Sequence, residues 1–308
     1  MIRPVLIAFA VVIAVFGAGV VLRNMLFSDG ASSAGPVATV GPPDAAVQRS
    51  SSAQLTVRRV EGHVERRGHD SEPWQPLAAN ASVSEQDSVR TDEGASAVLS
   101  GEGGFEIALA EQSELAMLAL KADQAKVVVQ RGQLSVATGQ SGTKLSVGAR
   151  DNEAWVEANR GAFAVLRDGD GQLAVAVTDG DVAVTSQQTR VQVNAGEQSI
   201  VPRNQPPARP TRIPTSLFLK VARSGPSRVN QRSTELAGVT NPGAAVFVNG
   251  VPAKTDATGA FTAKVSLQEG RNQLHVSVRD ALGRTRKEQL GDVTVDTQPP
   301  KLKGKTVW

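Results

Sequence analysis

The chain lacks cysteine and tyrosine altogether and has only 3 histidines among its 308 residues. The absence of cysteine excludes disulfides, thiolate metal sites, a cysteine nucleophile and a lipid attached through a thiol. Aromatic residues make up 4% of the chain, so a surface that stacks nucleic-acid bases on aromatic rings is not expected. We therefore predict no nucleic-acid partner.

Residues with catalytic or metal-binding chemistry are also sparse. His63 and His69 lie near Glu65 and Asp70 in the sequence, so these residues are candidate metal ligands. Zinc needs three or four converging ligands, whereas residues 63 and 65 are expected to share a strand face and residues 69–70 to lie in a polar turn. This arrangement does not favour a metal site. The segment "RDGDG" at 167–171 lacks the further carboxylates and distal Glu of a calcium loop, which favours a hairpin turn. With no Gly-x-Ser-x-Gly motif and no isolated carboxylate pair in an apolar run, the sequence predicts a non-enzyme without metal or cofactor.

An uncharged apolar run at the N-terminus, residues 4–22, lies between Arg3 and Arg23. At 1.5 Å per residue it spans about 28 Å, close to the thickness of a bilayer's hydrocarbon core. It is longer than the apolar part of a signal peptide, which favours a transmembrane anchor in the inner membrane with the body in the periplasm; export after signal cleavage is the alternative. Residues 23–53 are small, polar and rich in Pro and Gly, as in a flexible linker.

Charge divides the rest of the chain into two parts. Residues 55–201 contain 13 Lys/Arg and 21 Asp/Glu, a net charge of about −8, whereas residues 203–308 contain 17 and 7, about +10. We expect the two parts to attract each other, or the basic part to favour an anionic polymer or membrane surface.

Apolar residues alternate with polar ones throughout residues 54–201, in short runs broken by Gly, Asp and Asn. This period of two predicts many half-buried strands, and "RDGDGQ" and "TDGDV" have hairpin-turn chemistry. The segment 110–126 has high helix propensity, but its alternating Leu115, Met117 and Ala119 favour a strand. A weak repeat relates 131–149 to 179–197, which suggests a layered, solenoid-like or jelly-roll stack of sheets.

The stretch "SVRTDEGASAVLSGEGGFEIAL", residues 88–109, contains a cluster of glycines. A phosphate-binding loop has its glycines at the start of a helix, whereas these lie between alternating strands. We interpret them as bends, and we expect Arg90 to pair with a nearby carboxylate such as Asp87 rather than with a ligand.

Several motifs in order, "VRRVEGHVERR", "DSVRTDEGASAVL", "RGQLSV", "ANRGAFAVL" and "VNAGEQSIV", resemble the FecR-type periplasmic domain, over nearly all of 57–201. The resemblance assigns a structural role to six residues of the motifs: Gly62, Asp87, Arg90, Thr91, Gly161 and Gly196. FecR proteins are envelope sensors whose cytoplasmic segment controls an extracytoplasmic-function sigma factor. Because the apolar run begins at Pro4, we expect that segment to be missing here, so the anti-sigma role does not carry over directly.

A Pro-rich linker, residues 202–214, precedes a second region at 215–297. There, short alternating strands and an Asn249-Gly250 hairpin signal favour a β-sandwich. The spacing "NPGAAVFVNG…DATGAF…LQEGRNQLHVSVRDALG" resembles the bacterial Ig-like module found beside glucodextranase-type proteins, which implies spacing, display or binding rather than catalysis.

The whole chain is thus expected to be all-β apart from one N-terminal transmembrane helix, with a basic tail at 298–308. Basic residues near the C-terminus are candidate contacts for an anionic surface or partner, against the simpler interpretation of solvated turns: Arg284, Arg286, Lys287, Lys301, Lys303 and Lys305. The favoured function is a membrane-anchored envelope scaffold or sensor that binds an envelope protein, polysaccharide or peptidoglycan. The alternatives are a regulator of sigma-factor signalling that acts through a separate partner, and a glycan-binding accessory protein. The sequence leaves the oligomeric state open.

Overall fold

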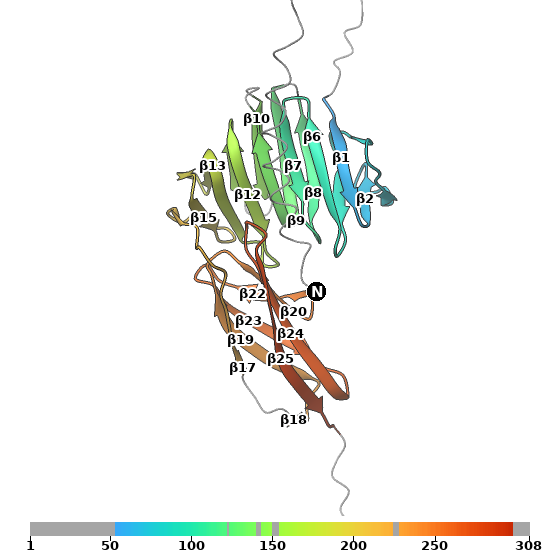
Figure 1. Cartoon of the computed structure of the whole chain (residues 1–308), viewed down its shortest axis with the longest axis vertical. Helices are drawn as coiled ribbons and strands as arrows, with labels where there is room; N and C mark the ends of the chain where they lie inside the picture. Colours follow the sequence, from blue (N-terminus) through green and yellow to red (C-terminus); the bar gives the residue numbers. More distant parts are fainter. Residues whose placement is uncertain (1–52, 122, 140–142, 150–153, 224–227, 298–308) are drawn as a thin grey trace, which may run out of the picture. The chain divides into compact units, whose positions relative to one another are not determined.

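The structure, a computed structural model, describes residues 53–121, 123–139, 143–149, 154–223 and 228–297, which belong to one compact unit (Figure 1). All regular structure in these residues is β-strand and none is helical, so the all-β prediction is confirmed for them. No described residue belongs to a helix able to cross a membrane. The predicted span 4–22, nearly all of the linker 23–53 and the basic tail lie outside the described residues.

Sixteen strands form the first domain. Their bounds are β1 Leu55–Glu61, β2 Val64–Arg67, β3 Gln75–Pro76, β4 Ser82–Val83, β5 Ser88–Thr91, β6 Ser96–Gly101, β7 Phe105–Leu109, β8 Glu114–Leu120, β9 Gln124–Thr138, β10 Lys144–Ala149, β11 Ala154–Ala158, β12 Gly161–Arg167, β13 Leu173–Ser186, β14 Thr189–Asn194, β15 Glu197–Val201 and β16 Thr211–Arg212.

These strands make two sheets that share the long strands β9 and β13. Sheet A has the order β4-β1-β6-β7-β9-β12-β13-β15-β16, and sheet B has the order β3-β2-β5-β8-β9-β10-β11-β13-β14. One apolar core contains inward side chains of both sheets, such as Ile107 and Val165 from sheet A and Met117 and Val156 from sheet B. The alternation in the sequence therefore reflects strands with one face on this core.

The chain passes between the sheets at many corners, and most of them contain a residue with positive φ. These residues are Gly62, Asn80, Gln86, Gly94, Gln112, Gly132, Gly161, Gly180 and Gly196. At Gly132 a Cβ atom would lie 2.6 Å from the Cα of Ser113, so both the φ of +83° and the close approach require glycine. Strands that change sheet at glycines are a common way of making the corners of a sandwich.

Two sequence predictions have different outcomes here. The segment 110–126 contains β8 and the start of β9, so the strand prediction is confirmed. The hairpin predicted at "TDGDV" is wrong, because β13 runs without interruption through Gly180. β13 pairs in sheet A up to Gly180, and residues 181–186 pair in sheet B, so this glycine lies where one strand crosses between the sheets.

The C-terminal domain consists of nine strands in two sheets. Their bounds are β17 Leu219–Arg223, β18 Arg228–Val229, β19 Ser233–Thr240, β20 Ala245–Val248, β21 Val251–Pro252, β22 Lys254–Thr255, β23 Ala260–Ser266, β24 Gly270–Arg279 and β25 Thr285–Val295. The orders are β17-β19-β23-β22 and β18-β25-β24-β20-β21, and apolar residues of both sheets share one core. The predicted hairpin at Asn249-Gly250 is confirmed, with φ of 49° and 80° at the two residues.

The Pro-rich segment 202–214 lies along the first domain. Ala208 N–H donates to Ile200 O at 2.8 Å, Ile213 N–H donates to Gly196 O at 2.9 Å, and β16 pairs with β15. The two domains also contact each other, since Leu166, Ala174 and Ala176 form a buried cluster with Ala245 and Ala281. An ion pair joins Glu111 of the acidic part to Arg279 of the basic part.

Candidate functional site

The FecR-motif residues Asp87, Arg90 and Thr91 lie on or beside β5 in sheet B. Asp87 is buried, and its carboxylate accepts hydrogen bonds from Ser84 N–H at 2.8 Å and from the Arg66 guanidinium at 3.4 Å. Asp87 therefore fixes the turn that leads into β5, and its cation partner is Arg66.

Arg90 pairs with a different carboxylate from the one we expected. Its Nε donates to Glu65 Oε2 at 2.6 Å across the β2–β5 ladder, so the predicted partner Asp87 is wrong. Strand alternation explains the error. The β2–β5 register places Arg90 and Glu65 opposite each other on the outer face of sheet B. Arg66, the next residue of β2, points to the opposite face of the sheet, so it is Arg66 and not Arg90 that contacts Asp87.

Arg90 belongs to a row of alternating charges across four strands. Register pairs Glu65 with Arg90, Arg90 with Glu114 and Glu114 with Arg131. Arg131 Nε lies 3.3 Å from Glu114 Oε2. Trp74 adds a cation–π contact, because its ring centroid lies 4.2 Å from the guanidinium of Arg90. The charges of this row are paired within the fold, which favours a structural role over ligand capture.

Thr91 begins a buried hydrogen-bond network that connects three corners of the fold. Its Oγ1 donates to Ala110 O at 2.6 Å and accepts from Ser113 N–H at 3.0 Å. Ser113 Oγ accepts from Gln133 N–H at 2.9 Å, and Gln133 Nε2 donates to Ala281 O at 2.8 Å. The motif threonine therefore ties the β5–β6 and β7–β8 corners to the bend in β9 and, through Gln133, to the C-terminal domain.

The motif glycines Gly62, Gly161 and Gly196 all occupy sheet-crossing corners. Sequence reasoning missed Glu65, Trp74, Ser113 and Gln133. Their alternation with apolar neighbours could have placed them on a strand face, but no local signal identifies partners that are 16 or more residues apart in sequence.

The basic residues predicted as partner contacts differ in their surroundings. Arg284 donates from Nε to Asp280 Oδ2 at 2.6 Å and thereby closes the β24–β25 hairpin. Arg286 and Lys287 are exposed on β25. Lys301, Lys303 and Lys305 lie outside the described residues. The contact of these residues with a partner stays a prediction.

The described residues contain no group of three or more His, Cys, Asp or Glu placed to hold a metal. His63 Nδ1 instead lies 2.7 Å from Asp92 Oδ2 at an exposed position. The "RDGDG" segment connects β12 and β13 as a turn, as predicted, with Asp168 accepting from Asp170 N–H at 3.0 Å and Gln172 N–H at 2.9 Å. Burial raises the pKa of the Asp168 carboxyl to about 6.

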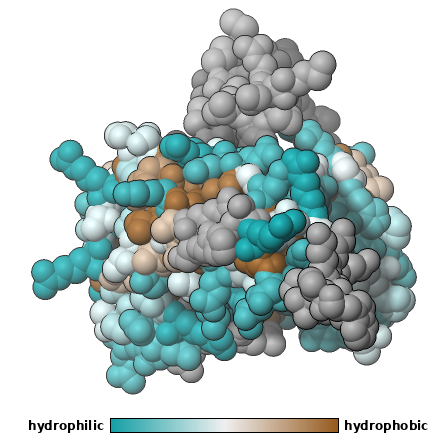
Figure 2. Space-filling view, turned by 90° about the horizontal axis from the view of Figure 1, so that it is seen from below, coloured by the Kyte–Doolittle hydropathy of each residue, from teal (hydrophilic) through white to brown (hydrophobic). Residues whose placement is uncertain are grey.

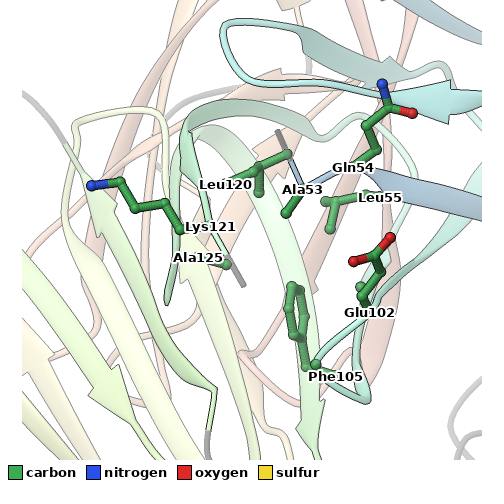
Figure 3. Close-up of a pocket in the computed structure, with 10 residues that line it drawn as sticks. Ala53, Gln54, Leu55, Glu102, Phe105, Leu120, Lys121 and Ala125 are labelled. Atoms are coloured by element: carbon green, nitrogen blue, oxygen red, sulfur yellow. The ribbon is translucent and has the colours of Figure 1, made fainter. Parts of the chain in front are cut away.

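A small hollow lies at the end of the first domain's core, between Leu55, Phe105, Leu120 and Ala125 (Figure 3). Its volume of about 10 Å³ is roughly what one water molecule needs, so it takes no larger ligand. Gly101 lies beside it at the end of β6, where a Cβ atom would be 2.3 Å from the Phe105 ring. This glycine therefore makes room for an aromatic side chain of the core.

The surface offers few apolar groups. Seen from below, it is mostly hydrophilic with one hydrophobic patch (Figure 2). In the part of the chain that the structure describes, three large apolar side chains are notably exposed, Phe218, Val239 and Val251, all in the C-terminal domain.

Part of this domain matches a protein-family model. The family model described as FecR protein matches residues 87–183, from the turn before β5 to the middle of β13. The match covers less than half of the chain, and it supports the FecR-type resemblance of the first domain. No curated protein matches the chain.

Solved structures give only weak similarity. Two crystal structures of a proposed anti-sigma factor from Parabacteroides distasonis ATCC 8503, at 2.50 and 1.65 Å, each have a TM-score of 0.36, at 20% and 19% identity. The alignments cover 41% of this chain and 59% of that protein. A polysaccharide lyase has a TM-score of 0.19 at 9% identity and covers 80% of this chain and 40% of its own. We draw no argument from TM-scores this low.

Proposed function

We propose that this chain is a non-enzymatic regulator of extracytoplasmic sigma-factor signalling that acts through a separate protein partner. The observation that carries the proposal is the match of the FecR family model over 87–183, a segment that contains strands of both sheets of the first domain. The motif residues of this segment hold the fold together, so the partner contact lies on the outer surface of the domain.

The architecture proposed around this domain is that of an envelope protein. The apolar run 4–22 is its transmembrane anchor in the inner membrane, and both β domains lie in the periplasm. The C-terminal sandwich is proposed to be an Ig-like spacing or binding module, and its two sheets of four and five strands, with β18 parallel to the last strand β25, support this proposal.

Crosslinking in living cells tests the proposed function. A photoreactive amino acid is introduced at exposed positions of the first domain, one per variant, and crosslinked products are identified by mass spectrometry. The proposal predicts recovery of a membrane-bound anti-sigma component from positions on one surface. The same residue introduced at exposed Lys254 of the C-terminal domain is the control. Recovery of no such component from any position would argue against the signalling role.

A second candidate function is a scaffold that binds an anionic envelope polymer, favoured by the charge of about +10 on residues 203–308 and by the exposed Arg286 and Lys287. The full chain in detergent should then be retained on peptidoglycan at moderate salt, because screening removes only the non-specific attraction. Replacing Arg286 and Lys287 with Gln should weaken retention, whereas replacing the exposed Lys254 and Lys264 with Gln should not. Equal retention of both double variants would exclude a specific contact at β25.

A further inference from the structure

The outer edge of sheet B is formed by β14, a strand of six residues. Among the described residues, β14 pairs only with β13, in an antiparallel register that places Val191 opposite Val184 and Asn194 opposite Asp181. This edge lies at the side of the first domain where β13 and β15 are labelled in Figure 1. One whole side of β14 is therefore unpaired in this part of the chain.

The direction of the backbone groups follows from the ladder. Ala195 N–H donates to Gly180 O, so it points toward β13, and alternate residues of an antiparallel strand point their N–H and C=O groups to opposite sides. Arg190, Gln192 and Asn194 thus point outward. Asn194 N–H donates to the Glu197 carboxylate at 3.0 Å, so Arg190 and Gln192 are the two outward positions of β14 at which the N–H and the C=O are both available for pairing.

Several other edges of the described strands are blunted. The remaining ends of sheets A and B are the two-residue strands β3, β4 and β16, and β3 includes Pro76. The side of β25 that faces away from β24 contains Arg286 and Lys287 and an irregularity near Leu290. Proteins generally use short strands, prolines, charges and bulges to prevent edge-to-edge pairing. β14 has no proline and no bulge, and its one charged side chain, Arg190, lies 3.9 Å from the Glu157 carboxylate of its own chain.

We propose that β14 pairs with β14 of a second copy of this chain, antiparallel, with Val191 on the two-fold axis. In this register Arg190 of one copy lies opposite Gln192 of the other. Each of these pairs exchanges two backbone hydrogen bonds, so four bonds use the N–H and C=O groups of Arg190 and Gln192 in both copies. The Glu197 cap on Asn194 ends the pairing on both sides. Sheet B of one copy then continues into sheet B of the other.

The side chains agree with this register. The two copies of Val191 face each other as a non-hydrogen-bonded pair, where side chains are closest, and their partly buried faces extend the apolar core. Arg190 meets the neutral Gln192, and Val193 meets Thr189, so no like charges are opposed. A self-complementary strand fits an isologous contact between identical chains.

The absence of cysteine from the chain provides a direct test. In the Val191→Cys variant the two thiols lie across a pair with Cα atoms about 4.5 Å apart, within the range of a disulfide. In the control variant Thr189→Cys, the two thiols are displaced by four residues along the strands, about 14 Å, which is too far. The full chain in non-ionic detergent is oxidised with copper phenanthroline and analysed on a non-reducing gel.

The proposal predicts a disulfide dimer for Val191→Cys and a monomer for Thr189→Cys. Adding Gln192→Pro to Val191→Cys removes an outward N–H without touching the β13 pairing, and should lower the crosslinked fraction at least about tenfold. Adding Gln192→Thr, which alters the same side chain but keeps the N–H, should leave the crosslink. A monomer for Val191→Cys, equal dimer formation by Thr189→Cys, or a Val191→Cys adduct with a different protein in membranes would each overturn the proposal.

Discussion

Replacing Thr91 with Val tests whether the FecR-motif threonine stabilises the corners of the first domain. The substitution keeps the side-chain shape but removes the hydroxyl that accepts from Ser113 N–H and donates to Ala110 O. Thr91 is 1% exposed and Ser113 is fully buried, so water cannot replace the lost partner. An unsatisfied buried N–H costs about 1–3 kcal/mol, and the lost hydroxyl bond adds about 1 kcal/mol.

We therefore expect Thr91→Val to destabilise the protein by about 2–4 kcal/mol, which lowers the Tm by roughly 5–15 °C in a domain of this size. The measurement is thermal unfolding of the full chain in non-ionic detergent, followed by tryptophan fluorescence. Thr178→Val is the matched control, because Thr178 also donates its hydroxyl to a backbone oxygen, Ala162 O, but is exposed. The control should change stability by no more than about 0.5 kcal/mol.

Thr91→Ser keeps the hydroxyl and should retain most of the stability that Thr91→Val loses. If Thr91→Val and Thr178→Val shift the Tm by the same small amount, the hydrogen-bond network does not hold the corners together, and this interpretation of the motif fails.

Three further outcomes follow from the described contacts. A double-mutant cycle with Glu65→Gln and Arg90→Gln should give a coupling of about 1 kcal/mol in urea unfolding, and additive effects would contradict the ion pair. Gly101→Ala should lower the Tm, at a cost of about 1–3 kcal/mol, because the Cβ of the alanine would overlap the Phe105 ring. Adding Phe105→Leu should relieve part of that loss, and an unchanged Tm for Gly101→Ala would contradict the packing. Because the pKa of Asp168 is raised in the folded protein, its contribution to stability is fully present below about pH 4 and is lost as the pH rises through about 6. The free energy of unfolding of the wild type, relative to that of Asp168→Asn, should therefore fall by at most about 3 kcal/mol over this range. A difference between the two proteins that stays constant with pH would refute the assignment.

Much of the fold was predictable because its signals are local. Alternation of buried and polar residues marked the strands, and Asn249-Gly250 marked a turn whose backbone needs positive φ at both residues. Gly180 shows the limit of predictions made from the local sequence. "TDGDV" has the chemistry of a hairpin turn, but the same positive φ also allows one strand to bend from sheet A into sheet B, and only the packing of the two sheets selects the bend.

The same limit applies to the candidate site. Arg90 was expected to find a carboxylate, and it does, but its partner Glu65 is 25 residues away and is selected by the β2–β5 register. Thr91 was recognised from its motif, whereas its partners Ser113 and Gln133 come from other corners of the fold. The residues that stabilise the corners can therefore be recognised from their sequence motifs, but their hydrogen-bond and ion-pair partners cannot be identified from the sequence.

The most direct test of the central claim is the transcriptome of a strain that lacks this chain, compared with the parent strain and with a strain in which the wild-type chain is restored. The proposed function predicts that one coherent set of genes, sharing a promoter of the kind read by an extracytoplasmic-function sigma factor, shifts in the deletion strain and returns on restoration. An unchanged transcriptome under conditions in which the chain is expressed would contradict the proposed role in sigma-factor signalling.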